Sequence, residues 1–573
     1  MTDLGANGPG GGRPYELTRD AHGLVARISG RGAVVLATPA VNRGTAFTRQ
    51  ERRDLGLLGL LPARVSTIDE QLRRTYEQYS AQPSDLRKWV YLATLRDRNE
   101  VLFHRLLSEH VAEMLPIVYT PTVGLAIERF SHEFRRSRGV FLSVDRPEDV
   151  EAALRNTCRG PDDVDLLVAT DSEGILGIGD QGVGGVEIAI GKLSVYTAAA
   201  GIHPDRGIPV VLDTGTDNVG LLDDDMYLGE RHPRIRDERY DRLIDAFVTA
   251  AGKLFPHALL HWEDFGATNA RRILERYAAD TASFNDDMQG TAAVVLAAVV
   301  AGVRATGGRM RDQRVVVHGA GTAGLGVADL LRDRMVAEGL DPREATRRFW
   351  ALGRNGLLTE DRTEHQYDFQ RPYARPAGEI PGGSLADVVA DVRPTVLIGT
   401  STQPGAFTEE IVRTMAAHTA RPIILPLSNP TSRCEARPAD LVAWTGGRAL
   451  VATGSPFAPV DLDGRRHEIA QANNALVFPG LGLGVTVARA RQVSAGMIAA
   501  AADAVAGLAD ATAPGGALLP PVTDLRRVSA AVAAAVVRSA ADEGLAQVAV
   551  ADPERQVAEA MWWPDYPRIE VVS

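Results

Sequence analysis

The chain has 573 residues, of which 45% are apolar and 24% are charged, so its composition is that of a globular protein with several domains. A formal net charge of -11, without any concentrated run of Lys or Arg, argues against nucleic acid as a partner and favours a small-molecule substrate. The two cysteines, Cys158 and Cys434, exclude a disulfide framework and a cysteine-based zinc site, and they fit a cytoplasmic protein.

The chain opens with a glycine-rich segment and continues into a helical region. Residues 1–40 are predicted to be a flexible tail and entry segment, because MTDLGANGPGGGRP lacks the apolar centre of a signal peptide. Apolar residues then recur at helical spacing, which predicts a helical N-terminal region over residues 41–140. The region ends with VYTPTVG, where Pro121 and Gly124 break the pattern and are expected to hold Tyr119 in a loop.

Residues 141–289 have the pattern of an α/β domain with a largely parallel sheet. Three β-rich runs end at Asp171, Gly215 and Asp264, and they alternate with helical stretches such as 188–200 and 239–253. Ligands of open parallel sheets bind beyond the carboxyl ends of the strands. The acidic residues that close these runs are therefore expected near a ligand.

A second α/β unit, residues 290–550, is predicted to bind a dinucleotide. It begins with an apolar stretch, 288–303, that is shorter than the ~20 residues of a membrane helix and is interpreted as a buried helix. Gly319, Gly321 and Gly324 then form a G-x-G-x-x-G between a predicted strand and helix, the context in which a helix N-terminus binds pyrophosphate. The last residues, 551–573, are interpreted as a C-terminal tail.

The cofactor type depends on the residues that follow the second strand of this unit, FWAL. An acid at that place favours NAD, whereas an arginine can bind the 2′-phosphate of NADP. Here Gly353 and Arg354 follow, which leans toward NADP unless Arg354 is only a solvated surface residue. A second glycine-rich run, ILGIGDQGVGG, leads to a lysine and is interpreted as a substrate loop rather than a second nucleotide site.

Several charged side chains could carry chemistry, and each has an ordinary structural alternative. Two acidic pairs lie at the ends of predicted elements: Glu263 with Asp264, and Asp286 with Asp287. Their oxygens suit Mg²⁺ or Mn²⁺, but acids at strand ends and helix starts also occur without a metal. Lys192 lies among apolar neighbours, where desolvation could make it a base, unless it extends to the surface.

Polar uncharged side chains give a second set of candidates. Tyr119, beside a proline turn, could donate a proton, although most tyrosines serve packing. Asn429 in PLSNPT and the pair Asn473 and Asn474 in QANNALVFPG could bind a carboxylate or the nicotinamide carboxamide. The alternative for these amides is a simple turn.

The motifs VYTPTVG, ILGIGDQGVGG, HWEDFG, FNDDMQGTA, HGAGTAG, PLSNPTS and QANNALVFPGLGLG, in this order, resemble the malic enzymes and the closely related malolactic enzymes over most of the chain, residues 42 to 566. The resemblance implies an α/β fold with a helical N-terminal region, an α/β substrate and metal domain and a Rossmann-type dinucleotide-binding domain. It also implies L-malate as substrate, NAD or NADP as cofactor, Mn²⁺ or Mg²⁺ as the metal, and a homodimer or homotetramer.

The resemblance also assigns roles to individual residues. Lys192 would be the general base, Tyr119 the general acid, and Asp286 would tune these two groups. The divalent metal would be bound by Glu263, Asp264 and Asp287. The cofactor would contact Gly319, Ala320, Gly321, Thr322, Ala323, Gly324, Arg354 and Asn429, and the substrate would contact Asn429, Asn473 and Asn474.

The implied reaction is oxidative decarboxylation of L-malate to pyruvate and carbon dioxide with reduction of NAD(P). The alternative is a malolactic enzyme, which converts L-malate to L-lactate with bound NAD. A non-catalytic, metabolite-sensing oligomer is disfavoured because Tyr119, Lys192 and the acidic ligands are all present. Two residues depart from the family pattern. Gly174 stands where many malic enzymes have an arginine that grips a substrate carboxylate, a variant associated with malolactic enzymes, and Gly353 stands where the family usually has Asp.

Overall fold

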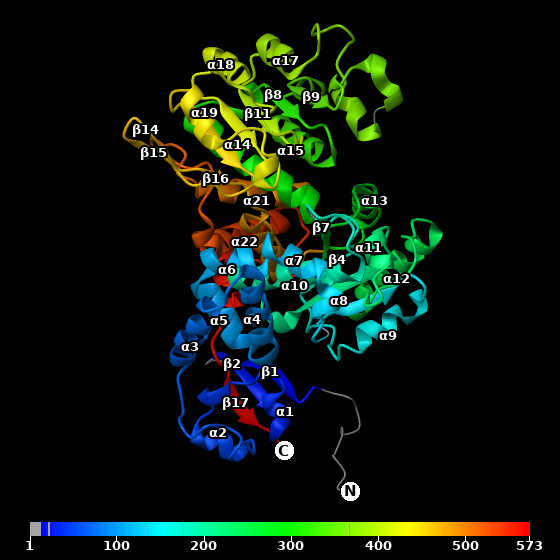
Figure 1. Ribbon diagram of the computed structural model, residues 1–573, viewed down its shortest axis with the longest axis vertical. Coiled ribbons are helices and arrows are strands. Elements are labelled where there is room, and N and C mark those ends of the chain that lie inside the picture. Colours follow the sequence, from blue (N-terminus) through cyan, green and yellow to red (C-terminus); the bar gives the residue numbers. More distant parts are fainter. Residues whose placement is uncertain (1–12, 21–22, 137, 176, 366, 573) are drawn as a thin grey trace. The chain divides into compact units, whose positions relative to one another are not determined.

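The computed structural model describes residues 13–20, 23–136, 138–175, 177–365 and 367–572, which fold into two compact units (Figure 1). The first unit comprises Met1–Gly266 together with Glu559–Ser573, and the second comprises Ala267–Ala558. The boundary falls after Gly266, whereas the sequence pattern predicts it after residue 289. The second unit therefore begins with α13 (Ala267–Tyr277) and β7 (Ser283–Asn285), two elements that the sequence pattern assigns to the α/β substrate and metal domain.

Segments that the sequence predicts to be tails form a small sheet in the first unit. β1 (Tyr15–Asp20) and β2 (Gly23–Ile28) are antiparallel, and β17 (Arg568–Val571) pairs with β2 in parallel. Ala26 and Ile28 of β2 are buried in a core with Phe47 and Leu55. The prediction of a flexible tail and entry over 1–40 is therefore wrong for β1 and β2, because strand pairing and this buried face stabilise them. The predicted C-terminal tail, 551–573, contains β17. Residues 1–12 lie outside the described residues.

The predicted helical N-terminal region is confirmed. Thr48 and Thr67 form capping boxes at the starts of two of its helices, where a hydroxyl and a glutamate satisfy backbone N–H groups that have no partner inside the helix. The helices bury Tyr79, Leu92 and Phe103 in one core. They are α2 (Arg49–Asp54), α3 (Ile68–Ser80), α4 (Asp85–Arg98), α5 (Glu100–Glu109), α6 (Val111–Val118), α7 (Thr122–Glu128) and α8 (Phe130–Glu133).

The parallel sheet of the first unit has the strand order β3-β5-β4-β6. Its strands are β3 (Val140–Ser143), β4 (Leu166–Thr170), β5 (Gly207–Asp213) and β6 (Leu259–Trp262). Two helices long enough to cover a sheet connect these strands, α10 (Val186–Val195), which continues as a π-helical turn over Tyr196–Ala200, and α12 (Glu238–Leu254). All four strands are parallel, so their carboxyl ends lie at one edge, as the sequence predicts.

The second unit contains a doubly wound sheet of the Rossmann type. Its strand order is β10-β9-β8-β11-β12-β13-β16, and only β10 is antiparallel to its neighbour. The strands that concern the cofactor are β8 (Val315–His318), β9 (Phe349–Gly353), β11 (Val396–Gly399) and β12 (Ile423–Pro426). The chain passes from β8 to β9 on one side and returns to β11 on the other. A crevice is expected at such a switch point, beyond the carboxyl ends of β8 and β11.

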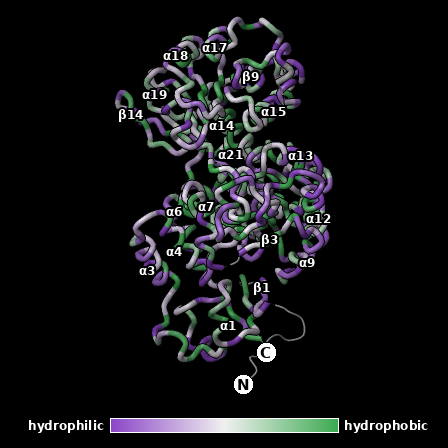
Figure 2. Tube along the Cα trace, turned by 45° about the vertical axis from the view of Figure 1, so that its right-hand side comes forward, coloured by the Kyte–Doolittle hydropathy of each residue, from purple (hydrophilic) through white to green (hydrophobic). Residues whose placement is uncertain are grey.

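Helices complete the core of the second unit. The segment Asp286–Thr306, a π-helical turn followed by α14 (Thr291–Thr306), is 21 residues long and apolar enough to cross a membrane, but 72% of its most apolar window is buried inside the protein. It is a core helix, as the sequence predicts, and Figure 2 shows it where green hydrophobic segments gather. In α20 (Phe478–Ala488), a Cβ at Gly480 would lie 2.6 Å from Val532, so glycine permits close packing on α22 (Leu525–Asp542).

Candidate active site

Three predicted side chains meet in the first unit. Lys192 Nζ lies 2.6 Å from Tyr119 Oη and 2.6 Å from Glu263 Oε1. The Tyr119 hydroxyl donates to the same carboxylate oxygen at 3.0 Å. Lys192 and Glu263 side chains are only 2% and 1% exposed, so the snorkelling alternative for Lys192 is excluded. A buried ammonium, a phenol and a carboxylate thus form one hydrogen-bonded group.

The local structure explains how these three residues converge. Tyr119 caps the end of α6 in an extended conformation, just before α7, so it lies between two helices rather than within one. Lys192 is in the last turn of α10. Glu263 directly follows β6. A lysine so placed, with a hydrogen-bonded phenol within reach, can exchange a proton with that phenol.

Two further residues extend this group, and neither was predicted from the sequence. His261 Nε2 lies 2.7 Å from Glu263 Oε2, and its Nδ1 lies 2.8 Å from the Tyr196 hydroxyl. The sequence position of each residue could have indicated it. His261 is two residues before Glu263 at the end of a strand, where alternate residues share a face, and Tyr196 is one helical turn after Lys192. The two residues fix the second oxygen of Glu263.

The electrostatics of the group keep Glu263 ionised. Burial by itself would raise the pKa of Glu263, but the adjacent Lys192 charge and the hydrogen bond from His261 lower it from 4.5 to about 2. Asp264, the next residue, is buried and has a φ of 54°, a left-handed conformation that is uncommon for a side chain other than glycine. Two adjacent buried carboxylates at a strand end have the oxygen donors that a hard divalent cation prefers.

The remaining predicted metal ligand and its neighbour belong to the second unit. Asp287 is half-buried in the π-helical turn Asp286–Gly290, whereas Asp286 is fully buried. The Asn474 amide donates to the side chain of Asp286 at 3.1 Å and to its backbone carbonyl at 3.2 Å. Asn474, which the sequence gives as a candidate substrate residue, therefore contacts Asp286 in the second unit. The roles assigned to Asp286 and Asp287 stay predictions.

The glycine-rich turn after β8 fits a pyrophosphate. Gly319 has a φ of 120°, and a Cβ there would overlap the backbone of Thr400. A Cβ at Gly324, in the first turn of α15 (Thr322–Ala337), would overlap the carbonyl of Gly319. At Gly321, by contrast, nothing lies within 4 Å of where a Cβ would be. Two glycines thus permit tight strand-to-helix packing, and the third leaves open the space at the helix N-terminus where a phosphate can bind.

A cavity of about 240 Å³ lies at this switch point. Its walls include Gly319, Ala320 and Gly321 from the turn, Gly353 and Arg354 after β9, and Gln370, whose amide donates to the carbonyl of Ala320 at 2.6 Å. Arg354 therefore lines the predicted cofactor site and is not only a solvated surface residue. Gly319, Ala320, Gly321 and Arg354, four of the predicted cofactor residues, are brought together here.

The other predicted amides have partners within the second unit. Asn429, three residues after β12, accepts a hydrogen bond from Ser455 at 2.5 Å. Asn473 caps a short helical turn and accepts from the backbone N–H of Ala475 at 2.9 Å. The turn alternative thus describes Asn473. Asn429 follows the carboxyl end of β12 but does not line the cavity of about 240 Å³, so its predicted contact with the cofactor stays a prediction.

The acids that end strands in the first unit do not all face a ligand. Asp171, after β4, accepts a hydrogen bond from the Tyr240 hydroxyl at 2.7 Å, and burial raises its pKa to about 6. Asp213, at the end of β5, accepts from the backbone of Glu230 at 2.8 Å. These two carboxylates bind the protein's own groups, and neither belongs to the acidic cluster that contains Glu263 and Asp264.

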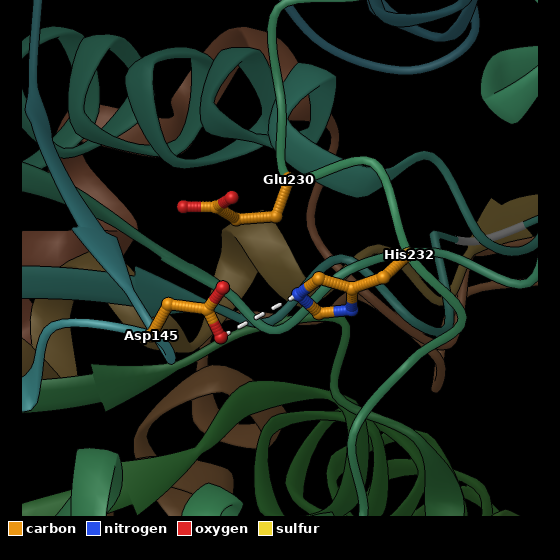
Figure 3. Close-up of side chains that lie close together, drawn as sticks. All are labelled: Asp145, Glu230 and His232. Atoms are coloured by element: carbon orange, nitrogen blue, oxygen red, sulfur yellow. Dashed lines mark ion pairs between the residues drawn. The ribbon is translucent and has the colours of Figure 1, made fainter.

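A second cluster of a histidine and two acids lies elsewhere in the first unit (Figure 3). His232 and Asp145 point toward each other, with Nε2 and Oδ1 3.7 Å apart, and Glu230 lies beside them. Arg239 pairs with Asp145, and Arg146 lies 3.7 Å from Glu230. Because arginines already balance both carboxylates, ion pairing accounts for this cluster without a metal.

The fold and these groups define a dinucleotide-binding α/β oxidoreductase with a buried lysine and carboxylates in its other unit. Sequence comparison gives the same answer. The family described as malic enzyme, N-terminal domain, matches residues 96–278, and the family described as malic enzyme, NAD binding domain, matches residues 288–541. The chain belongs to the malic enzyme family.

Individual relatives support this assignment. NAD-dependent malic enzyme 3 of Bacillus subtilis (strain 168) is 55% identical over 551 residues, which cover 95% of this chain and 97% of the relative. A malolactic enzyme of Lactiplantibacillus plantarum is 47% identical over 537 residues, which cover 93% and 98%. The crystal structure of Entamoeba histolytica malic enzyme has the same fold, with a TM-score of 0.54 at 23% identity and coverage of 89% and 92%.

Proposed function

We propose that this protein oxidises L-malate with NAD and decarboxylates the product to pyruvate and carbon dioxide, with a bound divalent cation. The observation that carries the proposal is the buried contact of Lys192 with Tyr119 and Glu263, at 2.6 Å each. A charged lysine that is held in the protein interior beside a proton-donating phenol has no evident packing purpose. It has the arrangement needed for acid–base catalysis.

The two proton-transfer residues would act in sequence. Lys192, an ammonium in its contact with Glu263, would first release a proton to water, and the neutral amine would then accept the proton of the C2 hydroxyl of malate as hydride leaves C2. The Tyr119 hydroxyl would donate the proton that C3 requires after carbon dioxide has left, and the 2.6 Å contact would let Lys192 return a proton to Tyr119. The chain's residues thus carry one proton from the first step to the last.

The residues also fit the two groups that the family uses. NAD would supply the hydride acceptor, and a cation would supply positive charge beside the ketone oxygen while carbon dioxide leaves. The open space at Gly321 and the cavity of about 240 Å³ fit the cofactor. Glu263 and Asp264, with Asp287 assigned by the sequence resemblance, would hold Mn²⁺ or Mg²⁺, since all offer oxygen donors.

NAD is the proposed cofactor, although Gly353 and Arg354 lean toward NADP in the sequence. Relatives with 55% and 49% identity are named NAD-dependent malic enzymes, and no comparison supports NADP. Arg354 lines the cofactor cavity, where a guanidinium can bind the pyrophosphate or the ribose as well as a 2′-phosphate. The arginine therefore does not require NADP.

A malolactic activity is the second candidate, because Gly174 stands in place of a carboxylate-gripping arginine. A Cβ at Gly174 would lie 3.0 Å from the carbonyl oxygen of Phe265, so a larger residue is crowded there unless the backbone shifts. The experiment that separates the two activities supplies L-malate, Mn²⁺ and NAD and measures absorbance at 340 nm together with pyruvate and lactate. Equal amounts of NADH and pyruvate support the proposal, whereas lactate without NADH supports the malolactic activity.

The assembly and location complete the proposal. We expect a homodimer or homotetramer in the cytoplasm, as the sequence resemblance and the cysteine content suggest. Analytical ultracentrifugation of the full chain would show a single species of two or four times 61.3 kDa. A monomer at micromolar concentration would contradict this part.

A further inference from the structure

A second cavity, of about 550 Å³, lies in the first unit and has no role in the proposed reaction. Its walls come from α4, α5, α10, β3 and β5 and from the segment before β1. We call it the arginine cavity, because five arginines line it: Arg13, Arg96, Arg136, Arg138 and Arg159. Its volume lies within the range of roughly 300 to 1,000 Å³ that small-molecule sites occupy.

The charges that line the arginine cavity do not balance. Only two carboxylates, Glu100 and Asp205, belong to its walls. Asp205 pairs with Arg13 at 2.6 Å and with Arg159 at 3.6 Å, while Glu100 pairs with Arg138 at 2.7 Å. Among the described residues, neither Arg96 nor Arg136 forms an ion pair with a carboxylate, and Glu187 and Asp97 act on Arg96 only at longer range. Arg136 is exposed to solvent, whereas Arg96 is buried.

Arg96 is the more informative of these two, because it is buried. It is 9% exposed, and its Nε is buried without a hydrogen-bond partner in the described part of the chain. Burial lowers the pKa of Arg96 to about 10, and the guanidinium lies 5.6 Å from the Phe103 ring. A cation–π contact is worth only about 0.5 to 2 kcal/mol, less than the several kcal/mol that desolvation of an ion costs. Packing alone does not account for Arg96.

A neighbouring side chain also has a buried nitrogen without a hydrogen-bond partner. His104, on α5, lines the arginine cavity and is buried, and its Nδ1 has no hydrogen-bond partner among the described residues. Buried polar groups in native proteins are nearly always paired. Two unsatisfied nitrogens on adjacent helices, both from residues that line one cavity, indicate that a ligand supplies the missing hydrogen-bond partners.

We propose that the arginine cavity binds a small metabolite that carries a phosphate monoester. A phosphate dianion would balance the two unpaired guanidinium charges, and a guanidinium fork can bind two of its oxygens. Asn156, Thr157 and Ser194 line the rest of the cavity and offer hydrogen bonds to the hydroxyl groups of a small polyol or sugar. A monocarboxylate would leave one charge unbalanced and fill less of the space.

The position of the arginine cavity links it to the catalytic lysine. Ile190, Leu193, Ser194 and Thr197 line the cavity and recur at helical spacing on one face of α10 and its π-helical extension. Lys192 does not line the cavity, but Tyr196, one helical turn after Lys192, does. An occupant would therefore contact the helix that positions Lys192, so binding can alter malate turnover.

The test measures binding directly, with glycerol 3-phosphate as probe and glycerol as the uncharged control, at fixed ionic strength and without malate or NAD. Calorimetry on the full chain should show saturable binding of one probe per chain, weakened at least tenfold in Arg96→Met and less in Arg96→Lys, which keeps the charge. Arg87→Met, at an exposed arginine of the same helix, should bind as the natural protein does. This readout does not depend on the proposed reaction.

Thermal stability distinguishes the proposal from a misfolded variant. Without ligand, Arg96→Met should melt at the same or a higher temperature than the natural protein, because it removes an unpaired buried charge. Glycerol 3-phosphate should raise the melting temperature of the natural protein and leave that of Arg96→Met unchanged. Lack of saturable binding by the natural protein, or equal binding by Arg96→Met, would overturn the proposal, as would a large fall in the melting temperature of unliganded Arg96→Met.

Discussion

The buried pair of Lys192 and Glu263 makes a quantitative prediction about stability and catalysis together. Lys192→Met keeps most of the side-chain length but removes the charge. It leaves Glu263, 1% exposed, with hydrogen bonds from Tyr119 and His261 but without its cation. Breaking a buried pair by removing one partner costs about 3 to 5 kcal/mol, because an uncompensated charge stays behind.

The lowered pKa of Glu263 agrees in direction with this cost. A value of about 2, against 4.5 for the ordinary group, corresponds to about 3 kcal/mol of preference for the charged form, at 1.36 kcal/mol for each pKa unit. Lys192 is the main group that lowers this pKa. We therefore expect Lys192→Met to lower the free energy of unfolding of the first unit by about 3 kcal/mol.

The assay is urea unfolding followed by circular dichroism, with three variants as comparisons. Lys253→Met removes an exposed lysine that pairs with Glu151 at 2.9 Å, and it should change stability by less than about 1 kcal/mol. The double variant Lys192→Met with Glu263→Gln removes both charges and should be more stable than Lys192→Met alone. If Lys192→Met were as stable as the natural protein, or if the double variant were less stable than either single one, the pair would not be a buried ion pair.

The same variant separates two steps of the reaction. Without Lys192 as base, malate oxidation should fall by roughly 100- to 10,000-fold. Decarboxylation of added oxaloacetate requires no base at the C2 hydroxyl and should fall much less. An equal loss of both activities would mean that Lys192 has a structural role or serves both steps.

Two further predictions concern the cofactor and the effect of pH. Gly353→Asp should retain kcat/KM with NAD and lower kcat/KM with NADP at least tenfold, because an acid there repels a 2′-phosphate. The substitution should be tolerated, since a Cβ at Gly353 would lie 3.5 Å from Leu358, an ordinary contact. An unchanged ratio would remove Gly353 from cofactor choice. Asp171→Asn should become more stable relative to the natural protein as pH rises, because the folded-state pKa of Asp171, about 6, lies above its ordinary 3.8. The stabilisation from Asp171 is present below pH 3.8 and is lost as pH rises through 6, so the difference between the proteins should grow by up to about 3 kcal/mol from pH 4 to pH 7.5 in urea titrations. A constant difference would show that Asp171 is already ionised in the folded protein at pH 4.

The sequence predicts the parts of the fold and site that depend on local patterns. The strand-glycine-helix order around Gly319 and Gly321 is short and specific, and the structure shows the expected turn. The buried helix α14 follows from an unbroken apolar run. Lys192 and Tyr119, by contrast, were identified mainly through the family resemblance, because neither has a local pattern that distinguishes a catalytic residue from a packed one.

The parts that the sequence does not predict depend on contacts between distant segments. The pairing of β2 with β17 joins residues more than 500 positions apart, so composition alone suggests two tails. His261 joins the site through its contacts with Glu263 and Tyr196. The burial of Arg96 and its unpartnered Nε are evident only in the folded chain. Such features follow from tertiary packing, which periodicity along the chain does not encode.

The most direct test of the central claim is a single set of reactions with the full chain, L-malate and NAD, followed at 340 nm and analysed for pyruvate and lactate. Protein treated with a chelator should be inactive, and Mn²⁺ should restore NADH and pyruvate in equal amounts, while Lys192→Met should stay inactive in the presence of Mn²⁺. Undiminished turnover by the chelator-treated protein, or malate oxidation by Lys192→Met at the natural rate, would contradict the assignment of a metal-assisted reaction to these residues.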